Sequence, residues 1–136
     1  MPSTDPSTLL RRALWGNAIF STATGVLLLL AGGVLGPFLG IPAMALRIVG
    51  LVLLPFAFGL WRNSARPAVH RGEAWAAVVL DLGWVGGSAA LVAFGLWPMT
   101  AAGTWAVIGV ADVVLVCALA QALGLVKSHR VMTLGH

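Results

Sequence analysis

Four long apolar segments dominate the sequence, and polar residues collect between them and at both ends of the chain. The segments cover residues 13–35, 43–60, 74–97 and 101–126. An α-helix needs roughly 17 to 25 residues to cross the hydrocarbon core of a bilayer, so the second segment is near the lower limit. Only short stretches of chain connect these segments, and helices joined in this way run in opposite directions. The pattern therefore predicts an all-α integral membrane protein, folded as an antiparallel bundle of four transmembrane helices.

Glycine, proline and threonine mark the expected ends of these helices. We expect Gly36-Pro37 to end the first helix and Gly40-Ile41-Pro42 to lead into the second. Pro55 lies inside the second segment and cannot donate a hydrogen bond to the carbonyl of Leu51, which predicts a bend there. Thr100 directly precedes the fourth segment, and its hydroxyl is suited to cap that helix.

Three polar regions flank and divide the four segments. Residues 1–12 form an N-terminal segment in which Asp5-Pro6 is typical of a helix start. Residues 61–72 are predicted to form a loop, and residues 127–136 a C-terminal tail. Because the chain crosses the bilayer four times, all three regions are expected on the same side of the membrane.

The positive charge of the chain predicts which side this is. Seven of the eight basic residues fall in the three polar regions, and such an excess is typical of the cytoplasmic face. We therefore expect both termini in the cytoplasm, and the protein in the plasma membrane, or in the inner membrane if it is bacterial. The first segment is too long for a signal peptide and no Ala-x-Ala site follows it, so we interpret it as a membrane anchor. The seven residues are Arg11, Arg12, Arg62, Arg66, Arg71, Lys127 and Arg130.

The composition excludes a water-soluble domain. Hydrophobic residues make up 60% of the 136 residues and charged residues only 9%, whereas a soluble domain has roughly a quarter of its residues charged. The net charge of +4 does not indicate nucleic-acid binding, because the basic residues form no patch interleaved with exposed aromatic side chains. The expected surroundings of the chain are the lipid bilayer.

We single out four polar side chains within the apolar segments: Asn17, Arg47, Asp81 and Asp112. At a rise of about 1.5 Å per residue, Asp81 lies roughly 10 Å into the cytoplasmic half, and Asn17 at a similar depth. Asp112 is expected near the middle of the fourth helix and Arg47 close to the outer boundary. Ionisable residues are rare and costly inside a membrane, so these positions are the candidate functional residues.

Asn17 and Asp81 are expected to lie on a polar seam between the first and third helices. Asn17 and Ser21 share one helix face by their spacing, and so do Asp81 and Ser88. The functional interpretation is a hydrated cavity or proton site, with Asp81 as its acid. The structural interpretation is that Asp81 is hydrogen-bonded to Asn17 and only holds the bundle together. Both interpretations are open at this point.

Asp112 and Arg47 offer a second pairing. Arg47 could act as the counter-ion of Asp112 across the second and fourth helices, or extend outward to the membrane surface. We favour the outward position for Arg47, which leaves Asp112 without a certain partner in its own chain.

Two pairs of glycines are candidates for close helix contacts. Gly32 and Gly36 lie one turn apart in the first segment, and Gly83 and Gly87 one turn apart in the third. Such pairs allow two helices to approach closely. They could serve helix packing inside the bundle or the association of two copies.

Motifs of enzymes and metal sites are not found in the sequence. There is no HExxH, GxSxG or P-loop pattern, and the single Cys117 excludes an internal disulfide. The three histidines fall in polar regions, so no haem-binding pair is expected inside the membrane. We therefore expect a protein that is not an enzyme, with no cofactor and no metal.

Two functions are compatible with these features. The first is a proton-coupled transporter or channel for a small solute, which uses intramembrane carboxylates and forms a homo-oligomer. The alternative is a non-catalytic accessory or assembly subunit, whose polar residues specify contacts with another membrane protein. The sequence does not name the substrate or the partner.

Overall fold

The computed structural model describes residues 6–134 and places the side chains of residues 8–127. It contains four helices, and no strand occurs within residues 6–134. All four are long and apolar enough to cross a membrane. The predicted fold class, an all-α membrane protein with four spanning helices, is confirmed. The helices are α1 (Pro6–Leu39), α2 (Ala43–Ala65), α3 (Arg71–Ala93) and α4 (Ala101–Leu134).

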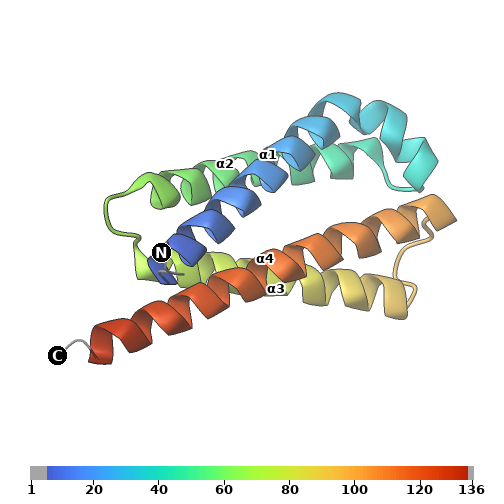
Figure 1. Ribbon diagram of the computed structural model, residues 1–136. Coiled ribbons are helices and arrows are strands. Elements are labelled where there is room, and N and C mark those ends of the chain that lie inside the picture. Colours follow the sequence, from blue (N-terminus) through green and yellow to red (C-terminus); the bar gives the residue numbers. More distant parts are fainter. Residues whose placement is uncertain (1–5, 135–136) are drawn as a thin grey trace.

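The helices form two antiparallel hairpins, α1–α2 and α3–α4, which lie against each other as two layers (Figure 1). α1 packs along both α2 and α4, and α3 packs along α4, whereas α2 and α3 contact each other only sparingly. The bundle is therefore closed between its first and last helices and open between its two middle helices. We call the end with the chain termini and the α2–α3 connection the charged end, and the other the far end.

A compact apolar core fills the charged-end half of the bundle. It draws on all four helices, and its most buried members, Leu14, Ala74 and Leu125, have an exposed fraction of 0%. The outer surface is also apolar: Leu30 and Val34 of α1 are 78% and 79% exposed. A surface of this kind is suited to contact with lipid chains. The core cluster consists of Leu10, Leu14, Ala18, Leu60, Ala74, Ala77, Val78 and Leu125.

Glycines allow α1 and α2 to approach closely. A Cβ atom added at Gly50 would lie 2.6 Å from the carbonyl oxygen of Gly25, so Gly50 has no room for a side chain. A Cβ atom added at Gly25 would lie 3.1 Å from the carbonyl oxygen of Gly50, which is a tight contact. Gly32 and Gly36 also face α2, in agreement with a packing role inside the bundle.

Gly83 and Gly87 behave differently from the pair in α1. A Cβ atom added at either position would meet nothing within 4 Å. Within the bundle, no neighbouring helix therefore packs closely against this pair. Both glycines lie on the side of α3 that faces α2, where the bundle is open.

The first helix continues past the residues that were expected to end it. Pro37 lies in the last turn of α1, where the missing N–H removes only one of the final hydrogen bonds. The helix ends at Leu39 because Gly40 adopts a positive φ of 71° and the N–H of Ile41 bonds to the carbonyl of Gly36. This is the usual glycine-dependent end of a helix.

Several other helix boundaries also differ from those of the apolar segments. α2 continues to Ala65 rather than ending near residue 60, so the first part of the predicted 61–72 loop is helical. α3 spans Arg71–Ala93 rather than 74–97, and α4 continues to Leu134 through most of the predicted tail. Hydropathy marks the residues that cross lipid, whereas polar residues can extend a helix into water. The predicted start at Asp5 lies outside the described residues.

The fourth helix begins as expected. The hydroxyl of Thr100 accepts a hydrogen bond of 3.1 Å from the N–H of Gly103, which confirms Thr100 as its N-cap. Thr100 also joins the two hairpins, because its N–H donates to the carbonyl of Leu39 and its hydroxyl to that of Phe38. The indole N–H of Trp97 donates to the carbonyl of Gly40. These contacts close the bundle at the far end.

The α2–α3 connection is held by buried and charged side chains. Asn63, 2% exposed, bonds to both backbone groups of His70: it donates to the carbonyl and accepts from the N–H. The Arg11 guanidinium donates to the backbone carbonyls of Ser64, Arg66 and Pro67, which satisfies acceptors at the end of α2. This connection is therefore fixed to the first helix.

Candidate functional site

The candidate site is centred on the Asp81 carboxylate of α3. Its Oδ2 atom accepts a hydrogen bond of 2.7 Å from the Nδ2 of Asn17 on α1. The same oxygen accepts a hydrogen bond of 3.0 Å from the Nε2 of Gln121 on α4. Three helices thus meet at one carboxylate oxygen. The structure brings together the Asn17 and Asp81 side chains that the sequence placed at a similar depth.

The amide of Asn17 is oriented by its own helix. The Ser21 hydroxyl, one turn further along α1, donates to the Oδ1 of Asn17 at 3.2 Å. This leaves the Nδ2 group of Asn17 directed at Asp81. Asn17, Ser21 and Asp81 are 1%, 4% and 5% exposed, so the polar atoms are shielded by the surrounding apolar side chains.

Gln121 was missed in the sequence, although it is an amide in the middle of an apolar segment. Besides Asp81, its Nε2 bonds to the carbonyl of Cys117 one turn earlier in α4. The Gln121 side chain is completely buried. Its Oε1 atom accepts no hydrogen bond, and it is the one buried side-chain atom among the described residues that lacks a partner. The signal that could have found it is its amide chemistry, which matches that of Asn17.

A cavity of about 280 Å³ lies against Asp81 on the far-end side of the network. All four helices line it, and its wall includes Ser21 and Thr24 of α1 and Val110 of α4. Both hydrogen bonds to Asp81 use Oδ2, and Oδ1 is not among the fully buried atoms without a partner. Asp81 lines this cavity, so a molecule in the cavity would lie beside its side chain.

A second cavity of about 420 Å³ continues from the first toward the far end. The two share wall residues from all four helices: Thr24, Val49, Trp84 and Val110. Ser88 lines this second cavity and is not part of the Asp81 network. Gly83 and Gly87 line it as well, and their missing side chains leave room beside α3.

The cavities reach the outer surface between α2 and α3. Residues of both helices line the first cavity and are also exposed, among them Val52 at 62% and Leu80 at 60%. At the charged end the apolar core cluster lies beneath Asp81, and at the far end Thr100 and Trp97 join the hairpins. The cavities are therefore open on the side of the bundle that would contact lipid.

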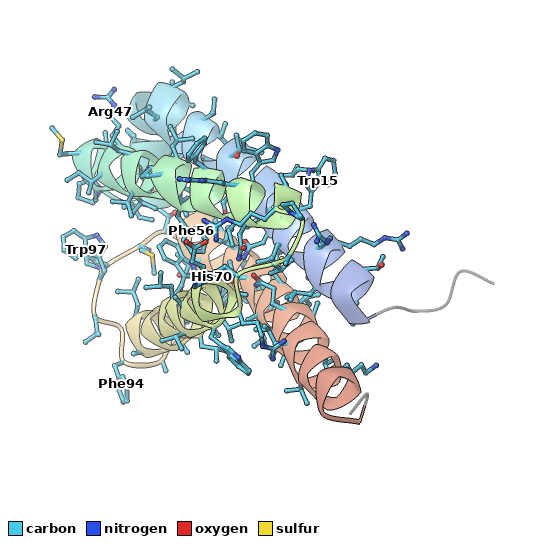
Figure 2. All side chains as sticks on the ribbon, turned by 90° about the vertical axis from the view of Figure 1, so that its left-hand side faces the viewer. Trp15, Arg47, Phe56, His70, Phe94 and Trp97 are labelled. Carbon is cyan, nitrogen blue, oxygen red and sulfur yellow. The ribbon has the colours of Figure 1, made fainter. Side chains whose placement is uncertain are left out.

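Arg47 and Asp112 lie on the outside of the bundle and line neither cavity. Arg47 lies over Gly32 and Gly33 of α1 and projects from the outer edge of the molecule (Figure 2). Asp112 is exposed on α4. Among the described side chains the ion pair found is Arg66–Glu73, so the structure does not bring Arg47 and Asp112 together within one chain.

No group of three His, Cys, Asp or Glu side chains in the described part of the chain is arranged to hold a metal ion. Comparisons of the chain with protein-family models, with curated proteins and with solved structures find no match. The protein is a small polytopic membrane protein with a buried carboxylate beside a laterally open cavity.

Proposed function

We propose that this protein is a proton-coupled transporter for a small solute, without enzymatic activity, and that Asp81 is its coupling group. The observation that carries the proposal is the position of this carboxylate. One of its oxygens is held by two amides, and the residue lines a cavity large enough for a small solute. A group used only to hold helices together has no need of a cavity beside it.

The amides of Asn17 and Gln121 have a defined role in this proposal. Both donate to Oδ2, so they stabilise the carboxylate after its proton leaves, and neither bonds to Oδ1. The α1 and α2 residues that line the first cavity carry no titratable side chain. The α4 residues that line it, Val110 and Val114, carry no titratable side chain either. Asp81 is therefore the acid that exchanges the proton.

A carrier also has to expose this group to both sides in turn. In the described arrangement the core cluster lies on the charged-end side of Asp81, and a third cavity, lined by Arg62 and Glu73, adjoins the first one between α2 and α3. Movement of one hairpin relative to the other is the proposed step, because α2 and α3 contact each other sparingly and leave the hairpins joined mainly through α1 and α4. Asp112 has no part in this route.

The proposed assembly is a homo-oligomer in the plasma membrane, or inner membrane of a bacterium, with both termini in the cytoplasm. The charge distribution supports this orientation. The exposed charges of Asp112 and Arg47 support association, because a carboxylate on a lipid-facing surface is costly unless a second chain supplies a partner. A stoichiometric foreign membrane protein bound at this surface would instead favour an accessory role.

Transport is tested with purified protein in phosphatidylcholine liposomes under an imposed pH gradient. Uptake is measured for a panel of radiolabelled small cations, neutral molecules and anions. We expect gradient-dependent uptake of at least one class, its loss in Asp81→Asn, and its retention in Asp112→Asn. Absence of gradient-dependent uptake across the panel, or equal uptake by Asp81→Asn and the unmodified protein, would overturn the proposal.

Orientation is tested separately with a membrane-impermeant maleimide. Cys117 is first replaced by Ala, and a single cysteine is introduced at position 128 or at position 99. In sealed cells or spheroplasts we expect labelling at position 99, in the far-end connection, and protection at position 128. The reverse pattern would place the termini outside the cell.

A further inference from the structure

We propose that the cavity between the two hairpins binds a hydrophobic monocation, which reaches it sideways from the bilayer between α2 and α3. This inference rests on the proposed transport function, because it names the class of solute for the same site. It is carried by the chemistry of the cavity wall, the position of the carboxylate and the side on which the cavity is open.

The wall of the cavity requires an apolar body. The two joined cavities are lined almost entirely by aliphatic and aromatic side chains. A strongly hydrated solute would lose its water against such a wall without gaining hydrogen bonds. The polar side chains in the wall are Ser21, Thr24, Asp81 and Ser88.

The charge of the site requires a cation. Asp81 is only 5% exposed, and no Lys, Arg or His side chain lines either cavity. The arginines near the charged end have other partners: Arg11 bonds to backbone carbonyls of the α2–α3 connection, and Arg71 bonds to the carbonyl of Leu125. Arg47 lies outside the bundle. A single positive group on the solute would therefore supply the counter-charge to the Asp81 carboxylate.

Aromatic side chains surround the place where this positive group would lie. Phe20, Phe56 and Trp84 line the first cavity together with Asp81. The faces of aromatic rings attract cations, most strongly when water is excluded. Phe56 belongs to α2 and Trp84 to α3, so the two helices at the opening both contribute to the same site.

The opening determines the route of the solute. The cavity walls at the α2–α3 side include Ile48 and Val52 of α2 and Leu80 of α3, all more than half exposed on the lipid-facing surface. The far end is joined by the bonds of Thr100 and Trp97. A solute that dissolves in lipid can use this side opening, whereas a solute confined to water cannot.

Two ions of the same shape and opposite charge test the inference. Radiolabelled tetraphenylphosphonium and tetraphenylborate are titrated against the protein in phosphatidylcholine nanodiscs, and saturable binding is measured. We expect saturable binding of the cation alone, weakened by about 10-fold or more in Asp81→Asn because the counter-charge is lost. Glu73→Gln, which removes a carboxylate outside the membrane, is expected to leave the Kd unchanged.

A second variant keeps the test valid if Asp81→Asn does not fold. Gly87→Leu fills the second cavity at a position where a Cβ meets no neighbour, and Gly109→Leu places the same side chain on the outside of α4. We expect Gly87→Leu to lose cation binding and Gly109→Leu to retain it. Equal binding of the two ions, or no saturable cation binding by the unmodified protein, would overturn the inference.

The outcome separates this inference from the proposal on transport. Cation binding that depends on Asp81, without pH-driven uptake, would support the binding site and contradict the transport function. Asp81-dependent uptake of a neutral or anionic solute, without cation binding, would support transport and contradict the solute class.

Discussion

Asn17 and Asp81 lie 64 residues apart in the chain, and their side chains meet through a hydrogen bond of 2.7 Å between Nδ2 and Oδ2. The bond joins α1 to α3 across the interior, while α3 packs mainly on α4. Gln121 completes the junction from α4. One carboxylate oxygen therefore connects the two hairpins at the inner end of the cavity.

Loss of the Asn17 amide is expected to destabilise the bundle. Asn17→Leu removes a donor to a buried carboxylate and should lower the free energy of unfolding by about 2 kcal/mol. Ser21→Ala, which only removes the bond that orients Asn17, should cost less. Both are measured by helical circular dichroism during denaturation of the protein in mixed detergent micelles.

The pairing of the two residues is checked by a double-mutant cycle. In an Asp81→Leu background, Asn17→Leu should cost much less than it does alone, because the group it serves is already absent. Additive costs would contradict a direct contact between Asn17 and Asp81.

Arg11 is expected to hold the α2–α3 connection against proteolysis. Arg11→Ala removes donors from the carbonyls of Ser64, Arg66 and Pro67, so residues 62–71 should open more often and trypsin should cleave there several times faster. Arg12 is exposed, and Arg12→Ala is the matched control. Equal cleavage rates for the two variants would show that the Arg11 contacts do not restrain the connection.

Gly50 and Gly83 are expected to respond in opposite directions to the same substitution. Gly50→Ala places a Cβ 2.6 Å from the carbonyl oxygen of Gly25 and should lower the free energy of unfolding by about 1–3 kcal/mol. Gly83→Ala meets no neighbour and should raise it by up to about 1 kcal/mol, since alanine favours a helix interior. Denaturation in detergent micelles measures both. A similar loss in both variants would mean that α3 has a close neighbour at Gly83.

The charges of Arg47 and Asp112 are expected to meet between two copies of the chain. Arg47→Asp and Asp112→Arg should each shift the protein toward monomer, because each places like charges at the contact. The double variant restores opposite charges and should recover the oligomer. Native mass spectrometry of nanodisc-extracted protein measures the distribution. Monomer in the unmodified protein, or no recovery in the double variant, would exclude this contact.

The sequence predicted the membrane crossings well, because hydrocarbon selects strongly for long apolar runs. It also placed Asn17 and Asp81 at one depth, because helix rise converts residue number into depth. It did not identify Gln121, although its amide is as polar as that of Asn17, because sequence spacing does not show which residue of the fourth helix faces Asp81. The close approach at Gly25 and Gly50, and the open space at Gly83 and Gly87, depend on which helix faces which. That arrangement is set by packing among four similar apolar surfaces, and no local pattern encodes it.

The seam between α1 and α4 has a consequence for biosynthesis. Of the four helices, α1 comes first along the chain and α4 last, and they supply the two amides that bond to Asp81. Until α4 is inserted, Asp81 of α3 lacks the hydrogen bond from Gln121, and its carboxylate lies in the membrane with an incomplete set of partners. The site can therefore form only after α4 has been inserted. Truncation within α4 should leave a chain that inserts but is degraded rapidly, with a half-life set by membrane quality control.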